Sequence, residues 1–445
     1  MNYAECLTYL ADLGHELRGI KFGLEPITAI LNVLGHPEQK YSTAIVAGTN
    51  GKGSTSAILA SILECAGYRT GLYTSPHLVR VNERIQVNGH EISDEDFAQS
   101  FTEIEQTVDR LIEEKSLAGR PSFFEFLTAT AFLHFARSQV DFVVLEVGMG
   151  GRLDATNVTE PRVAVITNVD LDHLEFLGST PAAIAREKAG IIKPSQPVIS
   201  ACEHPEAAQV IRSRCAELGA NLLETPSFAA VSGVRNRNGR YLFDLSLDGD
   251  RFRELTSPLR GKFQIKNAVA AVAAAWRLAQ EGFALPRSAI VEGLRKAKWP
   301  GRLEVVLESP LVMLDGAHNP AAAREVAAFL KDELAGRRVR LVYASMRDKA
   351  IAEIGAILFP LAEEIYLTRP GIERAATPEE ILAATRVRPE RVVIEPEPAR
   401  ALERACRASG SQDVVLAVGS LFLVGDIKKA LQESKLKLEL ASVRH

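Results

Sequence analysis

The strongest chemical signal in the sequence is a glycine-rich segment, GTNGKGS, at residues 48–54. The preceding residues 43–47 are apolar and β-branched, which predicts a buried strand, and apolar residues at helical spacing follow as far as Gly67. A strand, a glycine loop and a helix N-terminus together direct backbone N–H groups at an anion. We therefore predict a phosphate site, in which Lys52 supplies positive charge and Ser54 or Thr55 can reach a magnesium ion. The loop residues that we predict to bind the phosphate groups are Thr49, Asn50, Gly51, Lys52, Gly53 and Ser54.

This segment departs from the usual P-loop pattern. GxxxxGK[ST] would require a glycine at Val46 and a hydroxyl residue at Gly53, whereas the first glycine here is Gly48 and the hydroxyl comes one residue later. An ordinary glycine-rich turn is the alternative interpretation. A lysine and a serine beside three glycines, directly after a buried strand, favour phosphate binding.

Acidic side chains follow two further apolar segments. Residues 141–147, DFVVLEV, are typical of a buried parallel strand and contain Glu146. A buried carboxylate is costly unless it is paired or bound to metal, so Glu146 is a predicted magnesium ligand. The next apolar segment, VAVITNVD, leads to Asp170, Asp172 and His173. A lone histidine is more often structural, but three polar side chains at one strand end favour a functional cluster.

Lys188 lies among small apolar residues in a predicted helix over residues 180–192. Partial burial lowers the pKa of a lysine and makes its amine nucleophilic. An ion pair with Glu187 or a nearby aspartate is the other interpretation, and the sequence leaves both open.

Composition limits the class of protein. The 445 residues predict two or three domains, and 47% apolar with 24% charged residues is typical of a soluble globular chain. A net charge of −4 without a basic cluster argues against nucleic acid as a partner. Five scattered cysteines without a CxxC pair argue against a disulfide framework or a zinc site. We see no signal peptide and no apolar run of about 20 residues, and therefore expect a cytoplasmic protein that does not bind membranes.

The elements that position these residues predict an α/β fold. We expect a mostly parallel P-loop-type sheet with a small antiparallel appendage, whose hairpin turns at Asn238-Gly239. Trp299-Pro300-Gly301 breaks the chain before Arg302, so the predicted domains are residues 1–297 and 298–445. The second is a smaller Rossmann-like domain, with Asp315, His318 and Asn319 at the carboxyl end of a strand, where such sheets bind ligands.

Several separated motifs resemble one known family. GTNGKGS, TSPHLVRVNERI, the FFEF segment, GMGGRLDATN, LDGAHNP and GSLFLVG are similar to segments of the folate branch of the Mur ligase superfamily. Its members are dihydrofolate synthases and folylpolyglutamate synthases. The resemblance runs from about Phe22 to the end of the chain.

The resemblance implies roles that the residues alone do not. Without it, Ser75 would be a turn serine, and Phe124 and Glu125 would be a core residue and a helix N-terminal acid. It implies a carbamate on Lys188 and places His318 near the reacting groups, so that Lys52, Lys188 and His318 are the candidate catalytic residues. The implied metal ligands are Ser75, Glu146 and His173. The implied ATP contacts, besides the phosphate loop, are Asn267, Arg302 and Asp315, and Arg302 reaches the phosphates when the domains close. The implied pterin contacts are Phe124, Glu125, Leu153, Asp154 and Ala155.

The implied reaction is ATP-dependent ligation of L-glutamate to dihydropteroate and to folates through an acyl phosphate, with two magnesium ions, in a monomer whose partners are small molecules. A monofunctional folylpolyglutamate synthase is the first alternative. A cell-wall precursor ligase of the superfamily is disfavoured because FFEF and GGRLDATN match the folate branch. A P-loop NTPase or small-molecule kinase is disfavoured by the missing GxxxxGK[ST] pattern.

Overall fold

The computed structural model describes residues 1–14, 23–172, 174–385 and 391–433. The chain forms two compact units, which are described separately below. Unit 1 comprises Met1–Pro76, Val81–Pro258 and Gln264–Lys298, and unit 2 comprises His77–Arg80, Leu259–Phe263 and Trp299–His445. In the described part of the chain, no helix has the length and apolar character needed to cross a bilayer.

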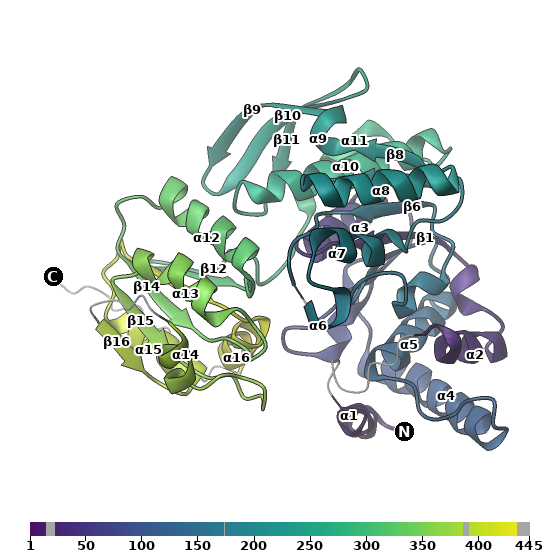
Figure 1. Ribbon diagram of the computed structural model, residues 1–445, viewed down its shortest axis with the longest axis horizontal. Helices are drawn as coiled ribbons and strands as arrows, with labels where there is room; N and C mark the ends of the chain where they lie inside the picture. Colours follow the sequence, from purple (N-terminus) through teal and green to yellow (C-terminus); the bar gives the residue numbers. More distant parts are fainter. Residues whose placement is uncertain (15–22, 173, 386–390, 434–445) are drawn as a thin grey trace. The chain divides into compact units, whose positions relative to one another are not determined.

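Unit 1 is built on an eight-stranded sheet in the order β4-β3-β2-β5-β1-β6-β7-β8, in which β2, β5, β1, β6, β7 and β8 run parallel (Figure 1). Because its central strands are almost wholly apolar, they can be covered on both faces, as parallel sheets require. The carboxyl ends of these strands share one edge, and the polar residues predicted from the sequence follow β1, β2, β5 and β6. The strands are β1 (Ser42–Ala47), β2 (Thr70–Tyr73), β3 (Ile85–Val87), β4 (His90–Glu91), β5 (Phe142–Glu146), β6 (Val163–Ile166), β7 (Pro197–Ser200) and β8 (Asn221–Glu224).

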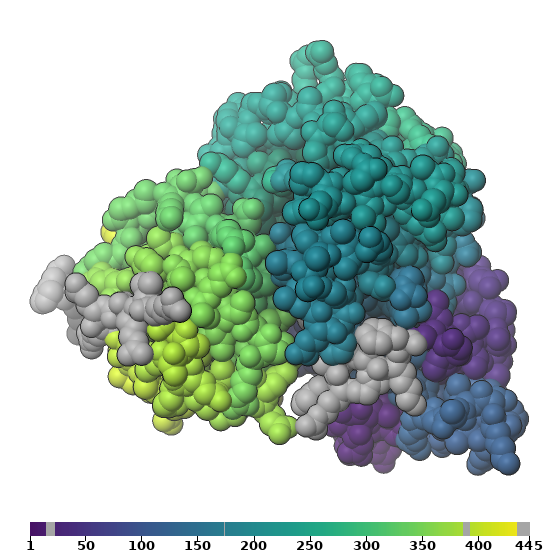
Figure 2. Space-filling model, viewed as in Figure 1, coloured from purple at the N-terminus to yellow at the C-terminus, as the bar shows by residue number. Residues whose placement is uncertain are grey.

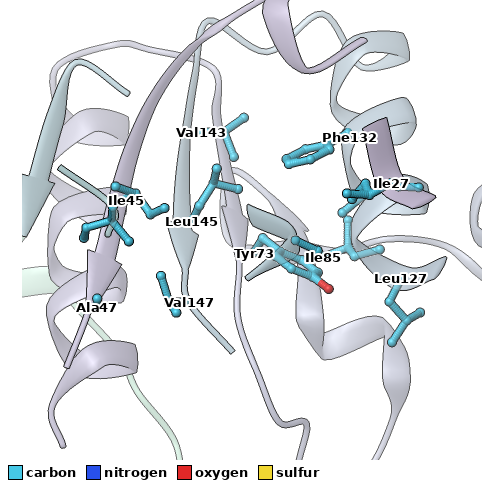
Figure 3. Close-up of a cluster of buried hydrophobic side chains, with 14 of the residues drawn as sticks. Ile27, Ile45, Ala47, Tyr73, Ile85, Leu127, Phe132, Val143, Leu145 and Val147 are labelled. Atoms are coloured by element: carbon cyan, nitrogen blue, oxygen red, sulfur yellow. The ribbon is translucent and has the colours of Figure 1, made fainter. Parts of the chain in front are cut away.

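Helices connect these strands and bury their faces. Figure 3 shows one cluster, in which Ile45 of β1 and Leu145 of β5 lie beside each other and Phe132 of α5 belongs to the same buried core. On α11, a Cβ added to Gly293 would lie 2.4 Å from the Ile62 Cα of α3, so only glycine allows these helices to pack so closely. The helices are α1 (Tyr3–Asp12), α2 (Glu25–Val33), α3 (Lys52–Cys65), α4 (Asp94–Glu113), α5 (Phe123–Arg137), α6 (Leu174–Leu177), α7 (Pro181–Ala189), α8 (Pro205–Leu218), α9 (Thr225–Phe228), α10 (Phe263–Gln280) and α11 (Arg287–Lys296).

The expected antiparallel appendage is a separate three-stranded sheet of unit 1, in the order β11-β10-β9. It consists of β9 (Ala229–Arg237), β10 (Arg240–Leu247) and β11 (Asp250–Ser257), and Asn238-Gly239 forms the first turn as predicted. Alternate residues of β10 are buried, whereas β9 is exposed along almost its whole length, and the hairpins project from the surface of the unit (Figures 1 and 2).

The polar and basic segment after β2, LVRVNERIQVNG, is regularly folded over much of its length. Val81–Arg84 forms a 3₁₀ turn, and β3 and β4 continue the sheet as an antiparallel hairpin. Asn88 and Gly89 at the turn both have positive φ. An Asn-Gly turn with both residues left-handed matches the twist of antiparallel strands, which explains the hairpin.

Unit 2 contains a six-stranded mixed sheet in the order β12-β13-β17-β14-β15-β16, in which only β12 is antiparallel (Figure 1). The antiparallel edge strand β12 begins two residues after Arg302 and was not predicted from the sequence. The strands are β12 (Glu304–Glu308), β13 (Leu311–Asp315), β14 (Val339–Tyr343), β15 (Glu364–Leu367), β16 (Arg391–Ile394) and β17 (Val414–Val418). The helices are α12 (Pro320–Glu333), α13 (Ile351–Leu358), α14 (Pro378–Ala384), α15 (Pro398–Arg407) and α16 (Leu421–Gln432).

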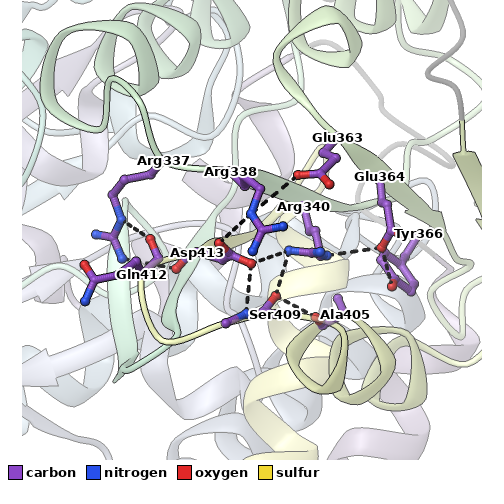
Figure 4. A network of polar contacts seen from close by, with 11 residues as sticks. Arg337, Arg338, Arg340, Glu363, Glu364, Tyr366, Ala405, Ser409, Gln412 and Asp413 are labelled. Carbon is purple, nitrogen blue, oxygen red and sulfur yellow. Dashed lines mark hydrogen bonds and ion pairs between the residues drawn. The ribbon is translucent and has the colours of Figure 1, made fainter.

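A buried ionic network joins the amino ends of three strands in unit 2 (Figure 4). The guanidinium of Arg340 donates to Asp413 at 2.7 Å and to Glu364 at 3.1 Å, and all three side chains are less than a tenth exposed. The Tyr366 hydroxyl donates to the same Glu364 carboxylate at 2.9 Å. This end of the sheet is opposite to the end that carries Asp315 and His318, so the network holds strands together rather than binding ligand.

Candidate active site

The glycines of the phosphate loop are required by close contacts as well as by backbone angles. A Cβ on Gly48 would lie 1.8 Å from Oγ1 of Thr167, and one on Gly51 would lie 2.3 Å from Oδ1 of Asn267. The φ angles of Gly48 and Gly51 are +153° and +83°, and the second lies in the left-handed region that favours glycine. The loop is therefore held between the end of β6 and the first turn of α10.

Lys52 is the first residue of α3, and its side chain folds back over the loop. Its Nζ donates to the carbonyl oxygens of Gly48 at 3.1 Å and Thr49 at 3.3 Å. The N–H groups of the first turn of an α-helix have no acceptor within the helix, so this turn presents donors as well as the ammonium charge. Ser54 and Thr55 are both buried in this turn, and the Thr55 hydroxyl has no hydrogen-bond partner among the described residues.

Ser75 and Glu146, both predicted metal ligands, are brought together at the ends of the neighbouring strands β2 and β5. The backbone N–H of Ser75 donates to Oε2 of Glu146 at 3.2 Å, and Glu146 is only 4% exposed. A carboxylate beside a hydroxyl residue is the oxygen donor set that magnesium prefers. The third predicted ligand, His173, lies outside the described residues. Within those residues, no group of three or more histidine, cysteine, aspartate or glutamate side chains is arranged to hold a metal.

Lys188 is almost completely buried in α7, at 3% exposure. Burial and the nearby charge of Lys52 lower the pKa of its amine to about 7, although Asp172, Asp154 and Asp170 oppose the shift. Among the described residues its Nζ has no ion-pair partner within 4 Å, which disfavours the alternative of a simple pair with Glu187. Glu187 instead accepts from Arg152 at 3.1 Å. A lysine that is partly neutral at neutral pH can act as a nucleophile.

Asp154 organises the loop that follows β5. Its carboxylate accepts from the Met149 N–H at 3.0 Å, from the Thr156 N–H at 3.1 Å and from the Thr156 hydroxyl at 2.6 Å. Burial raises the pKa of Asp154, and these hydrogen bonds oppose the shift. The predicted pterin contacts Leu153, Asp154 and Ala155 therefore lie on a loop whose shape the aspartate fixes.

The other two predicted pterin residues begin α5. Glu125 forms a capping box with Ser122, accepting from its N–H at 2.8 Å and from its hydroxyl at 2.7 Å. The ring of Phe124 packs on Gly148, where an added Cβ would lie 2.6 Å from the ring, and it is 5.9 Å from the ring of Tyr73. Phe124 thus lies beside the backbone that follows Glu146.

Three residues that the sequence analysis did not select hold the phosphate loop. Thr167 and Asn168 follow β6 and contact the loop, and Gln264 accepts from Nδ2 of Asn267 at 2.8 Å. Gln264 is 1% exposed, and its Nε2 has no partner among the described residues. The only sequence signal for them was position, because each directly follows a strand end or opens a helix next to a selected residue.

Unit 2 carries the remaining candidates at the carboxyl end of β13. Asp315, 3% exposed, accepts from the N–H groups of Leu303 and Ala317, both at 2.8 Å. Burial raises the pKa of Asp315, and the charge of Arg302 opposes this shift. A Cβ on Gly316 would lie 2.8 Å from Nη1 of Arg302, so the guanidinium lies over this glycine.

His318 and Asn319 follow on the same loop. Nδ1 of His318 lies 2.8 Å from the Gly316 carbonyl oxygen, so Nδ1 carries the proton and Nε2 is the basic atom of the neutral ring. Asn319 caps α12, because its Oδ1 accepts from the Ala322 N–H at 2.9 Å. Asp315, His318 and Asn319 thus lie together at the carboxyl end of β13.

Comparison with known proteins agrees with this architecture. Residues 46–275 match the Mur ligase middle domain, and residues 301–421 match the glutamate ligase domain of the Mur ligases. The chain belongs to the Mur ligase family.

Within that family it belongs to the dihydrofolate synthase/folylpolyglutamate synthase branch, as the resemblance indicated. It is 37% identical over 416 residues to the dihydrofolate synthase/folylpolyglutamate synthase of Bacillus subtilis, with 93% of this chain and 96% of that one covered. The structure of Escherichia coli FolC in complex with DHPP and ADP superimposes with a TM-score of 0.87 at 34% identity, covering 98% of this chain and 99% of that chain. The Yersinia pestis bifunctional enzyme complexed with AMPPNP and Mn ion gives a TM-score of 0.85 at 33% identity, covering 97% of this chain and 98% of that chain.

Proposed function

We propose that this enzyme ligates L-glutamate to dihydropteroate and to folates and converts ATP to ADP and phosphate. The observation that carries the proposal is the full-length likeness, across both units, to enzymes named dihydrofolate synthase/folylpolyglutamate synthase. The phosphate loop and the paired Ser75 and Glu146 supply the local chemistry that such a reaction needs.

The reaction has two steps. An oxygen of the pteroate or folate carboxylate attacks the γ-phosphorus of ATP, which forms an acyl phosphate and releases ADP. The amine of L-glutamate then attacks the acyl carbon, the amide bond forms and phosphate leaves. Lys52 and the N–H groups of the first turn of α3 stabilise charge on the transferring phosphoryl group, so catalysis rests mainly on electrostatics and placement.

A divalent metal–ATP complex is the expected nucleotide substrate, since the Yersinia pestis relative was solved with AMPPNP and Mn ion. Ser75 and Glu146 fit magnesium by donor type, and His173 remains a candidate ligand. Magnesium, as two ions by family resemblance, would neutralise the phosphate oxygens. Glu146→Gln keeps an acceptor for the Ser75 N–H but removes the charge, and we expect it to abolish most turnover while leaving the fold intact.

Lys188 is proposed to carry a carbamate. The neutral amine would attack CO₂ to form the N–C bond and release one proton, and the product would add negative charge near Lys52. The buried amine with a pKa of about 7 supports this reaction. We expect activity to fall in CO₂-depleted buffer and to return on addition of bicarbonate, and ¹³C NMR with labelled bicarbonate should detect a carbamate that Lys188→Arg lacks.

The remaining substrate contacts are also proposals. Asn267, Arg302 and Asp315 are the expected ATP contacts, and the ring of Phe124 and the loop shaped by Asp154 are the expected pterin contacts. Asp154→Asn should alter KM for dihydropteroate more than KM for ATP.

The decisive experiment measures phosphate release from ATP in the presence of magnesium and L-glutamate, with dihydropteroate or tetrahydrofolate added in separate reactions. The products are identified by mass spectrometry. Glutamate-dependent addition to both pterins establishes the bifunctional enzyme, and addition to tetrahydrofolate alone assigns a folylpolyglutamate synthase. If phosphate release does not depend on glutamate and no product gains the mass of a glutamyl group, the ligase proposal is overturned and an NTPase is favoured. Sedimentation of the active enzyme would test the expected monomer, and cell fractionation the expected cytoplasmic location.

A further inference from the structure

Asn168, the second residue after β6, is bonded directly to the phosphate loop. Its side-chain Oδ1 accepts from the N–H of Asn50 at 2.8 Å and from the N–H of Thr49 at 3.1 Å. The Thr49 N–H is also 3.1 Å from the backbone carbonyl oxygen of Asn168. One amide oxygen therefore bridges two consecutive backbone donors, as an anion does in a backbone nest.

The residues on either side of Asn168 strengthen this attachment. The Thr167 hydroxyl donates to the Asn50 carbonyl oxygen at 2.6 Å. Thr49 and Asp170 are bonded reciprocally: the Thr49 hydroxyl donates to the Asp170 carbonyl oxygen at 3.1 Å and accepts from the Asp170 N–H at 3.0 Å. Residues 167–170 thus bind the N–H groups of Thr49 and Asn50, the Thr49 hydroxyl and the Asn50 carbonyl oxygen.

This arrangement changes which groups can bind phosphate. In the usual P-loop the backbone N–H groups of the loop cradle the phosphates. Here the N–H groups of Thr49 and Asn50 are already bonded to protein, so the donors that face an anion come from the first turn of α3 and from Lys52. Ser54, the hydroxyl residue that lies one position later than in the usual pattern, agrees with anion binding by the helix rather than by the loop.

We propose that Asn168 is a positioning residue for the nucleotide, whose neutral amide oxygen sets the conformation of the phosphate loop and so aims Lys52 and the α3 donors at the phosphates. The inference rests on the proposed function only in taking ATP as the nucleotide. The proposal requires a neutral side chain at this position. A carboxylate here would be repelled by the phosphates and by the Asp170 carboxylate, whose Oδ2 is 3.4 Å from the Asn168 amide nitrogen.

The test compares Asn168→Ala and Asn168→Asp with a control at another hydrogen-bonded amide side chain, Gln196→Ala. Gln196 is 5% exposed and its amide accepts from the Lys193 N–H, but it precedes β7 and so lies at the opposite edge of the sheet. Calorimetry with ADP and with a non-hydrolysable ATP analogue, thermal melting, and KM for ATP and for glutamate are measured for each variant.

We expect Asn168→Ala to weaken nucleotide binding by about tenfold or more, since two hydrogen bonds that shape the loop are lost, with KM for glutamate unchanged. Asn168→Asp keeps a hydrogen-bond acceptor but adds a negative charge. Its loss of affinity should therefore be larger for the ATP analogue than for ADP. Gln196→Ala should lower the melting temperature without changing nucleotide affinity.

If the Asn168→Ala protein folds and binds nucleotide with wild-type affinity, the proposal is overturned. It is also overturned if Asn168→Ala loses no more nucleotide affinity than Gln196→Ala does. If Asn168→Ala does not fold, unchanged affinity of Asn168→Asp for both nucleotides overturns it. Because binding is measured without turnover, a wild-type protein that binds ATP but transfers no glutamate would overturn the proposed function and leave this inference standing.

Discussion

Asn267 lies directly over Gly51, so that a single added Cβ on the glycine would lie 2.3 Å from the asparagine Oδ1. The first turn of α10 and the phosphate loop are therefore in close contact inside unit 1. Gln264 accepts from Nδ2 of Asn267 at 2.8 Å, which directs the Asn267 oxygen toward the loop. Gly51, Asn267 and Gln264 thus depend on one another for their placement.

Gly51→Ala should reduce kcat/KM for ATP by at least about 100-fold, because a methyl group here meets Asn267 and also strains a backbone at φ +83°. Gly282→Ala is the matched control: this glycine follows α10 with φ +94°, but an added Cβ meets nothing within 4 Å. The control should lose about 1 kcal/mol of stability and no activity. Equal activity in the two variants would contradict the close contact.

Lys188→Met should raise stability at pH 7 and below when CO₂ is excluded. The pKa of the amine is about 7 in the folded protein, compared with 10.5 for an unperturbed lysine in the unfolded chain. Between pH 7 and pH 10.5 the folded chain therefore binds fewer protons than the unfolded chain. Stability of the wild type therefore rises with pH through this window. The gain from methionine should be a few kcal/mol at pH 7 and should shrink as the pH rises toward 10.5.

The measurement for this prediction is the melting temperature at pH 7 and pH 9, with Lys40→Met, at an exposed position, as the control for replacing a lysine by methionine. A pH-independent difference between wild type and Lys188→Met would show that the pKa of Lys188 is not lowered. Loss of activity in the same variant is expected from the proposed carbamate.

Arg340→Met should destabilise unit 2 by about 3–5 kcal/mol, because it removes the buried guanidinium that Asp413 and Glu364 share while both carboxylates stay buried. Urea unfolding checks the magnitude, and Arg407→Met, which removes an exposed pair with Glu403, should cost no more than about 0.5 kcal/mol. A loss as small as that of the control would contradict the structural role of the network.

The same network predicts acid sensitivity. Burial favours a raised pKa for Asp413, but hydrogen bonds from Gly410, Arg340 and Arg338 outweigh burial and hold the pKa of this carboxyl below its usual range. A carboxyl group with a depressed pKa stabilises the fold above its unfolded pKa and loses that contribution as the pH falls through the folded value. The Arg340→Met variant should therefore show a weaker loss of stability below pH 4 than the wild type.

His318→Ala should lower kcat by about 100-fold or more if Nε2 assists the attacking amine, with KM for ATP nearly unchanged. The ring is oriented by the 2.8 Å contact between Nδ1 and the Gly316 carbonyl oxygen, so His318→Gln should not restore the rate. Full activity in His318→Ala would remove the histidine from the reaction.

Local sequence determined most of the secondary structure and the position of the phosphate loop. A β-branched run before glycines and an apolar helix after them allow few other structures, and β1 and α3 lie where the pattern predicted. The apolar run that contains Glu146 predicted β5 for the same reason. The hairpin of β3 and β4 could not be predicted in the same way, because polar and basic residues dominate its sequence and only the Asn-Gly turn indicates it.

Only the tertiary structure decided which residues meet at the site. Asn168 reaches the phosphate loop from 118 residues away because β6 pairs with β1, and Ser75 meets Glu146 because β2 pairs with β5. Strand pairing joins segments that are distant in the chain, and no local periodicity records which strand will be the neighbour. The sequence alone therefore identified the groups capable of phosphate chemistry, whereas the sheet order assigned each of them its partner.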